Sequence, residues 1–149
     1  MQIVLFEPEI PPNTGTIARL CAATNTRLHL IEPLGFSLED RYLKRAGLDY
    51  WPQVDLRVWP EWEAFASTLD DPRQIVLTSA RQGRSLYEYS FGGQESLVFG
   101  PETKGLPDGL WAKSSNRLRI PIWGQVRSLN LANAAAVCLY EAYRQIGWV

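Results

Sequence analysis

The sequence alternates short apolar runs with stretches of helical spacing, and this alternation constrains the fold more than any other feature. The runs predict five or six strands, at residues 2–6, 28–31, 54–59, 74–79, 97–99 and 118–122. Strands that alternate with helices form a mostly parallel sheet, because each crossover helix packs back onto the sheet. We therefore predict an α/β fold with helices on both faces of that sheet.

Capping residues, prolines and glycines predict where the helices lie. Asn13 or Thr14 can cap a first helix that ends near Ala23, and Ser128 or Asn130 can cap a last one. The last helix is predicted at residues 129–146 and ends at a glycine. The remaining predicted helices cover residues 37–46, 60–69 and 106–113.

Composition limits the classes of protein to which the chain can belong. With 149 residues, 46% of them hydrophobic, it is long enough for one domain, residues 1–149, with a proper core. No run approaches the ~18 apolar residues of a membrane span, and the N-terminus lacks the basic region of a signal peptide. We therefore expect a cytoplasmic protein with no membrane partner. The net charge of −1 leaves nucleic-acid binding to local patches.

The residues needed for metal chemistry and for the common nucleotide motifs are missing. Cys21 and Cys138 are the only cysteines and lie in helical apolar patterns, so we interpret them as buried thiols and expect no metal site. Gly100 and Gly105 have the spacing of a P-loop, but leucine stands where that motif requires lysine. His29, the single histidine, lies within a predicted strand and is interpreted as a core or edge residue.

Two loops that follow predicted strands are dense in glycine and polar residues. The segment LVFGPETKGLP (residues 97–107) ends a strand in a Gly-rich turn before a helix, the usual place of a ligand crevice in an open α/β sheet. The segment IPIWGQVRSLNLAN (residues 120–133) presents Ser128, Asn130 and Asn133 at a helix N-terminus, where free N–H groups can bind a ligand. An ordinary turn and plain helix capping explain the same residues, so both interpretations stay open at this point.

These two segments and NTGTIAR (residues 13–19) resemble, in order and spacing, the three motifs of SPOUT-class RNA methyltransferases. The opening IVLFEPEIPPNTG, with LHLIEPLGF and LKRAGLDYW, is similar more narrowly to the TrmL branch, over nearly the whole chain. That branch methylates the ribose 2′-hydroxyl at the wobble position of certain tRNAs with S-adenosylmethionine. The resemblance implies a tRNA (cytidine(34)-2′-O)-methyltransferase that acts on cytidine or a modified uridine in an anticodon loop, with a leucine tRNA as the expected substrate.

The resemblance also implies a knotted fold and a cofactor site. SPOUT domains tie the C-terminal segment into a trefoil knot, an exception to the rule that chains are unknotted. The cofactor lies in that knot and is held mostly by backbone groups of three loops. The corresponding positions here, which we expect to bind S-adenosylmethionine, are Leu77, Gly100, Ile120, Ser128, Leu129 and Asn130.

Members of this class are homodimers whose active site draws on both subunits. Their first and last helices form the interface between the subunits. The run NAAA (residues 133–136) fits such a close approach of helices, although an ordinary buried helix also uses small residues.

Three polar residues match the catalytic positions of the class. Methyl transfer to a ribose hydroxyl is an in-line displacement, which needs positioning and a stabilised oxyanion. Arg19 matches the motif arginine. Because a guanidinium stays protonated, we expect Arg19 to pair with a phosphate beside the target ribose rather than to act as a base. Glu102 matches the motif glutamate and is expected to organise the loop around Arg19, with Asn13 in support.

A basic helix is the candidate RNA-binding surface. Arg41, Lys44 and Arg45 share one face of the short helix predicted at residues 37–46, and the matching segment of the branch is likewise basic. A merely solvated charged face fits the same pattern. Tyr50 and Trp51 are candidates for stacking on an unpaired anticodon base, or belong to the core.

Departures from the class pattern affect the expected substrate. Ile122 stands where relatives often have methionine, Ala132 where they often have serine, and WGQV (residues 123–126) replaces a more polar loop. Cofactor binding by backbone groups survives such changes, whereas recognition of a particular tRNA depends on them. Two alternatives remain: methylation of another RNA site by the same fold, and a non-catalytic RNA-binding homologue. The intact motif residues argue against the second.

Overall fold

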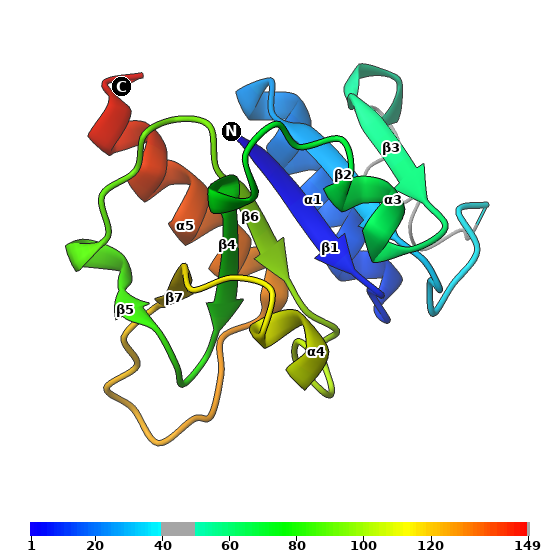
Figure 1. Cartoon of the computed structure of the whole chain (residues 1–149). Coiled ribbons are helices and arrows are strands. Elements are labelled where there is room, and N and C mark those ends of the chain that lie inside the picture. Colours follow the sequence, from blue (N-terminus) through cyan, green and yellow to red (C-terminus); the bar gives the residue numbers. More distant parts are fainter. Residues whose placement is uncertain (40–49, 149) are drawn as a thin grey trace.

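The computed structural model describes residues 1–39 and 50–148, and a seven-stranded parallel sheet lies at the centre of this part (Figure 1). The strand order is β3-β2-β1-β6-β4-β7-β5, and every neighbouring pair is parallel. All carboxyl ends therefore meet at one edge. The strands are β1 (Gln2–Phe6), β2 (Arg27–Ile31), β3 (Leu56–Trp59), β4 (Ile75–Ser79), β5 (Arg84–Ser85), β6 (Ser96–Phe99) and β7 (Arg117–Arg119).

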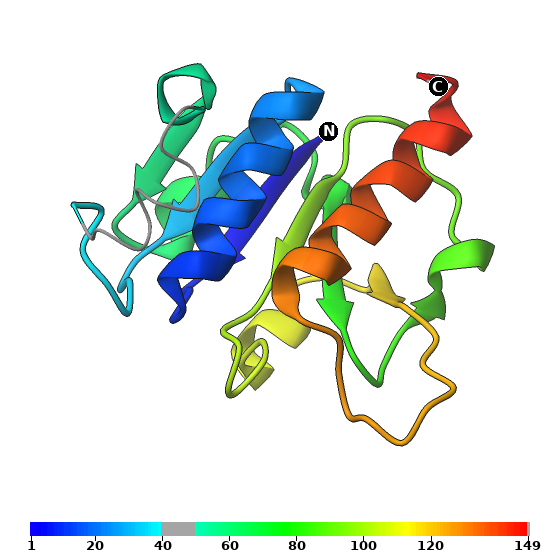
Figure 2. The same cartoon turned by 180° about the vertical axis from the view of Figure 1, so that it is seen from behind.

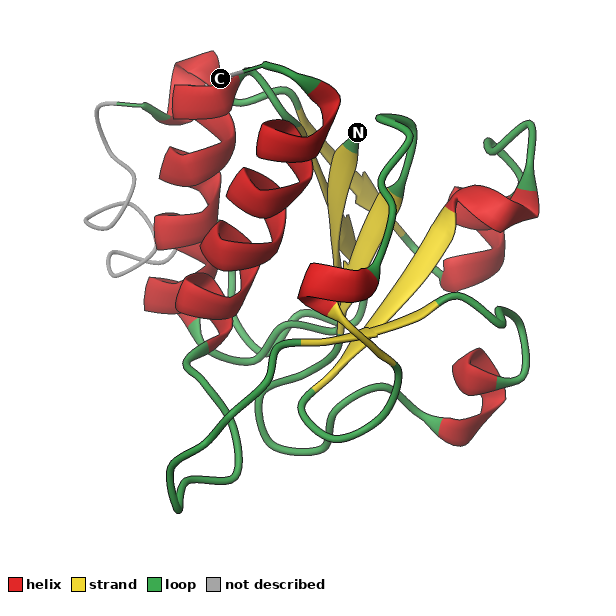
Figure 3. Cartoon of the chain, turned by 90° about the vertical axis from the view of Figure 1, so that its left-hand side faces the viewer, coloured by secondary structure: helices red, strands yellow, loops and turns green. Residues whose placement is uncertain are grey.

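Helices cover both faces of the sheet, as a parallel sheet requires. Helices α1 and α5 pack side by side on one face, and the shorter α3 and α4 lie on the other (Figures 2 and 3). The predicted α/β architecture is thereby confirmed. The α-helices are α1 (Pro11–Thr24), α3 (Trp62–Ala66), α4 (Asp108–Trp111) and α5 (Leu131–Ile146), and the 3-10 helices are η1 (Trp51–Gln53), η2 (Pro72–Gln74) and η3 (Leu86–Glu88).

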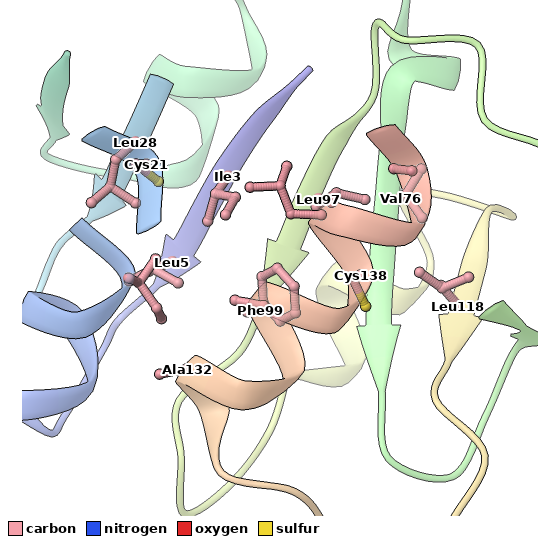
Figure 4. Packing of buried hydrophobic residues seen from close by; sticks show 14 of the residues in the cluster. Ile3, Leu5, Cys21, Leu28, Val76, Leu97, Phe99, Leu118, Ala132 and Cys138 are labelled. Atoms are coloured by element: carbon pink, nitrogen blue, oxygen red, sulfur yellow. The ribbon is translucent and has the colours of Figure 1, made fainter. Parts of the chain in front are cut away.

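Successive strand residues fill two apolar layers, because their side chains alternate between the faces of the sheet. Ile3 points into the larger layer, which also holds the thiols of Cys21 and Cys138 from α1 and α5 (Figure 4). Val4 points into the smaller layer, against Phe65 of α3. Burial raises the pKa of both thiols to about 12, so they stay protonated, and their prediction as buried thiols is confirmed.

The predicted strands differ from the observed ones mainly where a loop leaves the sheet. The strand predicted at residues 118–122 ends at Arg119, because the chain from residue 120 onward turns away from the sheet. Strand β5 was not predicted, since a two-residue strand such as Arg84–Ser85 has no hydrophobic period to detect. The other strands agree within two residues.

All four α-helices of the described residues begin at other positions than predicted, and α3, α4 and α5 each begin two residues later. Helix α1 begins at Pro11 with Ile10 as N-cap, so Asn13 and Thr14 lie inside its first turn and do not cap it. Proline is well suited to that first position because it has no N–H to satisfy. Helix α3 begins after Glu61 rather than at residue 60. Asn130 does cap α5, and the left-handed Gly147 ends it, as predicted. The helix predicted at residues 37–46 extends outside the described residues.

His29 is a buried, fully bonded histidine, as predicted. Its ring is 3% exposed, Nδ1 accepts a hydrogen bond from Trp59 Nε1 at 2.8 Å, and Nε2 lies 3.0 Å from Gln2 Oε1. Because Nδ1 is the acceptor, the neutral ring carries its hydrogen on Nε2 and donates it to Gln2. Burial, assisted by the charges of Arg27 and Arg57, lowers the pKa of His29 to about 4. The ring is therefore neutral at pH 7.

We predict that His29 makes the fold sensitive to acid between pH 6.5 and pH 4. The pKa of 6.5 in the unfolded chain exceeds the value of about 4 in the fold, so only the unfolded chain binds this proton in that window. The stability that the neutral ring contributes is therefore present above pH 6.5 and lost as the pH falls toward 4. The advantage of wild type over His29→Gln in free energy of unfolding should shrink by roughly 2 kcal/mol across this range. Urea denaturation at each pH measures it, and an advantage independent of pH would contradict the prediction.

Candidate functional site

A cavity of about 680 Å³ opens at the carboxyl edge of the sheet. Its walls are the loops that follow β4, β6 and β7, together with Ile10 and Asn13 at the start of α1. The loops after β4 and β7 lie together at the lower edge of the molecule in Figure 1. This volume is typical of a small-molecule site, and the carboxyl edge of a parallel sheet is where such sites form.

Glu102, on the loop after β6, is bonded to the start of α1. Its Oε2 accepts the backbone N–H of Glu9 at 2.9 Å, and its Oε1 accepts the N–H of Ile10 at 3.3 Å and Nδ2 of Asn13 at 3.0 Å. The first N–H groups of a helix have no partner within the helix, and the helix dipole favours a negative charge there. Glu102 therefore fixes one wall of the cavity to α1.

Asn13 continues this network to the third loop. Its Oδ1 accepts a hydrogen bond from Asn130 Nδ2 at 2.9 Å, while its own Nδ2 is bonded to Glu102. Asn130 Oδ1 in turn accepts the N–H groups of Ala132 and Asn133 and so caps α5. The buried Asn13 amide thus joins three segments that are far apart in the sequence.

A second pair of contacts fastens the same two loops together. The carboxylate of Glu9 accepts hydrogen bonds from the backbone N–H of Thr103 at 2.9 Å and from its Oγ1 at 2.8 Å. These bonds hold the pKa of Glu9 below its ordinary value. The carboxylate of Glu102 also accepts the backbone N–H of Glu9, so bonds in both directions fix the loop after β6 to the segment just before α1.

Gly100 is required by the close turn at the end of β6. A Cβ on this residue would lie 2.4 Å from the backbone nitrogen of Leu106, which no side chain tolerates. The loop therefore folds back tightly over the strand and leaves the space of the cavity open beside it.

Five of the six predicted cofactor-binding residues line the cavity, and one does not. Leu77 is fully buried in the smaller apolar layer, and the two residues after it, Thr78 and Ser79, line the cavity in its place. The five that line the cavity are Gly100, Ile120, Ser128, Leu129 and Asn130.

Arg19 is separated from Glu102 and Asn13 within the single chain. It lies six residues beyond Asn13 on α1, on a different side of that helix, and does not line the cavity. Its guanidinium lies 4.6 Å from the centre of the Tyr50 ring, a cation–π contact. The predicted RNA-binding residues Arg41, Lys44 and Arg45 lie outside the described residues.

Several residues of the site were not predicted. Glu9 and Thr103 organise the loops, and Arg81, Lys104 and Arg127 bring positive charge to the cavity wall. An acidic residue just ahead of a helix start was the available signal for Glu9. Within the described residues, no three His, Cys, Asp or Glu side chains form a metal-binding group. No helix in that part of the chain has the length and apolar content needed to cross a membrane.

The open parallel sheet with a cavity at its carboxyl edge defines a ligand-binding α/β domain. Within that class, the chain belongs to the SpoU rRNA Methylase family, whose sequence pattern matches residues 1–140. The methyltransferase resemblance inferred from the three motifs is thereby confirmed.

Similar proteins align over nearly the whole chain. It is 52% identical over 145 residues to a protein of Methylovorus glucosotrophus named tRNA (cytidine(34)-2′-O)-methyltransferase, with 96% of this chain and 94% of that protein covered. A protein of the same name from Saccharophagus degradans is 50% identical over 148 residues, with 98% and 96% covered.

Solved structures have the same fold. One, described as "Structural insights into the 2-OH methylation of C/U34 on tRNA", superposes with a TM-score of 0.94 at 50% identity, with 99% of this chain and 97% of that chain covered. Another is the SpoU methyltransferase AviRb from Streptomyces viridochromogenes in complex with AdoMet. It superposes with a TM-score of 0.85 at 26% identity, with 100% of this chain and 61% of that chain covered.

We predict that two variants of Asn130 separate its cap from its bond to Asn13. Asn130→Ala removes both, and loss of the cap alone lowers the free energy of unfolding by about 1 kcal/mol. Asn130→Asp keeps an oxygen for the N–H of Ala132 but cannot donate to Asn13. It should therefore regain much of the stability while the loop that lines the cavity loosens.

Urea denaturation measures the first effect, and the rate of tryptic cleavage after Arg127, in the loop that lines the cavity, measures the second. Equal stability of the two variants, or cleavage of Asn130→Asp at the wild-type rate, would show that the cap and the loop link are not separable in this way.

Proposed function

We propose that this protein transfers the methyl group of S-adenosylmethionine to the ribose 2′-hydroxyl of the wobble nucleotide, position 34, of a tRNA. The observation that carries the proposal is the near full-length likeness to proteins of that name, at 50–52% identity, with a fold that matches the C/U34 structure at a TM-score of 0.94. We expect the nucleotide at position 34 to be a cytidine or a modified uridine. We expect the methyl acceptor to be a leucine tRNA.

Two features of the cavity support S-adenosylmethionine as the methyl donor. Its volume suits a ligand of this size, and no backbone group of residues 122–129 forms a hydrogen bond with a described residue. Those N–H and C=O groups are available to a ligand, as AdoMet in AviRb occupies a related fold. When bound, the cofactor supplies the methyl group from its sulfonium. The residues proposed to hold it are Gly100, Ile120, Ser128, Leu129 and Asn130, with Leu77 behind the loop after β4.

The hydrogen-bond network has a positioning role in this proposal. Both oxygens of Glu102 accept bonds from α1, and its partner Asn13 is bonded at both ends. These groups therefore hold the cavity walls rather than move a proton. In-line transfer depends on such rigidity, because small displacements of the reacting atoms cost large factors in rate.

Arg19 enters the reaction in this proposal from the second copy of a homodimer. It is exposed on α1 and does not line the cavity of its own chain, so a single chain leaves the site without it. Helix α5, beside α1, exposes Val137 and Tyr140, which suits burial against a second copy. Across that interface, Arg19 would pair with a phosphate next to the target ribose and stabilise the charge that develops on the 2′-oxygen.

We also propose that the chain has the trefoil knot of the SPOUT class, that residues 1–149 form a single domain, and that the protein acts in the cytoplasm. Strand β7 lies inside the sheet, between β4 and β5. From there residues 120–130 run past the loop after β4 before they reach α5 (Figures 1 and 2). A chain that leaves an inner strand and passes a neighbouring loop in this way suits a threaded C-terminal segment.

The first experiment is transfer of labelled methyl groups from S-adenosylmethionine into unmodified and native bulk tRNA, followed by nucleoside analysis. We expect a 2′-O-methylated nucleoside at position 34 of a leucine tRNA. Bound cofactor without any incorporation into tRNA would move the substrate to another RNA. Neither binding nor incorporation would favour a non-catalytic RNA-binding protein.

We predict that Arg19→Ala abolishes methyl transfer while the affinity for S-adenosylmethionine stays within a few-fold, since Arg19 does not line the cavity. Glu102→Ala should also be inactive, for loss of positioning. Mixed at equal amounts after joint refolding, the two inactive variants should regain about a quarter of wild-type activity, because half of the dimers are mixed and each holds one complete site. A mixture as inactive as its parts would overturn the shared site.

A further inference from the structure

Trp123 is the most exposed of the large apolar side chains in the described part of the chain, with 84% of its surface in water. It follows Ile122, which lines the cavity, and precedes Gly124 in the stretch without backbone hydrogen bonds. Tryptophan is highly buried on average, since its indole carries a large apolar surface. An indole left in water one residue from the wall of a ligand cavity is the feature that the proposed function has not explained.

Three cations surround the same opening. Arg81, Lys104 and Arg127 line the cavity, one from each of its three loops. None of them forms an ion pair with a described residue. Glu102 is the single acidic residue among the described lining residues, and Glu9, whose carboxylate bonds to Thr103 and is attracted by Lys104, lies beside them. The three cations outnumber these two carboxylates. Although the net charge of the chain is −1, the opening of the cavity is therefore locally positive.

We propose that Trp123 stacks on an unpaired base next to the methylated nucleotide, while Arg81, Lys104 and Arg127 contact the adjacent phosphates. This inference rests on the proposed function, because it takes the anticodon loop of a tRNA as the occupant. Single-stranded RNA is bound by this combination of an aromatic face for a base and cations for the backbone. Trp123 is thereby a specificity-determining residue at the edge of the site, and not a catalytic one.

Charge favours RNA over a second copy of this chain as the partner of Trp123. The cavity wall, which Ile122 next to Trp123 helps to line, carries the three cations described above, and these match the negative charge of phosphates. Lysine, one of the three, is depleted at the centre of protein interfaces. The apolar surface that suits a second copy lies elsewhere, on α5 at Val137 and Tyr140.

The first test measures steady-state kinetics on a synthetic anticodon stem-loop with cytidine at the wobble position. For Trp123→Ala we expect KM to rise on the order of 10-fold, as loss of one stacked base predicts. The affinity for S-adenosylmethionine and kcat should stay near wild type. Trp123→Phe should restore most of the loss and Trp123→Leu should not, because leucine offers apolar area without an aromatic face.

Trp148→Ala is the matched control. Trp148 is also an exposed tryptophan, 65% in water, but it lies at the C-terminal end of α5, at the opposite edge of the molecule from the cavity loops (Figure 1). We expect it to leave KM for the stem-loop unchanged. A rise in KM equal to that of Trp123→Ala would show a general effect of losing surface tryptophan and would overturn the proposal.

The second test asks which base Trp123 contacts. Stem-loops with a single abasic nucleotide, placed in turn at each loop position beside the wobble nucleotide, are methylated by wild type and by Trp123→Ala. At one position the two losses should not add, because the base and its platform are then removed from the same contact. Additive losses at every position would overturn stacking.

The same experiments separate this inference from the proposed function. A wild-type enzyme that methylates none of the stem-loops, yet methylates another RNA, would refute the wobble assignment and the inference together. A wild-type enzyme that is active, with Trp123→Ala equal to it, would refute only the role of Trp123. A Trp123→Ala protein that sediments as a monomer would assign the side chain to the contact between two copies and would likewise overturn the role in RNA binding.

Discussion

The side-chain amide of Asn13 is the contact on which the arrangement of the site depends. One end binds Glu102 and the other binds Asn130, so a single buried group joins α1, the loop after β6 and the N-terminus of α5. Each partner also satisfies backbone N–H groups at a helix start, at Glu9 and Ile10 in one case and at Ala132 in the other. Because Asn13 is buried, losing either partner leaves one end of its amide unpaired, which costs more than the bond itself contributes.

The parallel sheet brings these segments together. In a parallel sheet every strand ends at the same edge, so loops after β4, β6 and β7 meet although long stretches of sequence separate them. The order β1-β6-β4-β7 places the start of α1, which follows β1, next to the loop that carries Glu102. Helices α1 and α5 then pack side by side on one face, which brings Asn13 within reach of Asn130. The topology brings the three segments close together, and the hydrogen bonds of the Asn13 amide fix their relative positions.

Strand positions and the fold class could be predicted from the sequence because apolar periodicity is a local signal. Strand β1 was predicted with its observed bounds, and Asn130 was among the predicted caps of α5. The bonds of Glu102 to α1 could not be derived from residue patterns, because they depend on which strands are neighbours. The start of α1 was misplaced since Pro11 begins the helix and frees Asn13 to bond elsewhere. The side chain of Leu77 lies in the smaller apolar layer, so its predicted contact with the cofactor stays a prediction for the backbone at the base of the loop after β4.

A site held by backbone groups permits change in the side chains that border it. Residues 122–129 leave their N–H and C=O groups free, and these groups are the same whatever residues stand there. Side chains of that stretch that do not line the cavity are then free to serve a second ligand, and the exposed indole of Trp123 has the aromatic face that the inferred contact with an RNA base requires. The hydrogen bonds that join Asn13, Glu102 and Asn130 involve none of the side chains of residues 122–129. In the proposed function, backbone groups of this stretch therefore hold the cofactor and a side chain of the same stretch contacts the RNA.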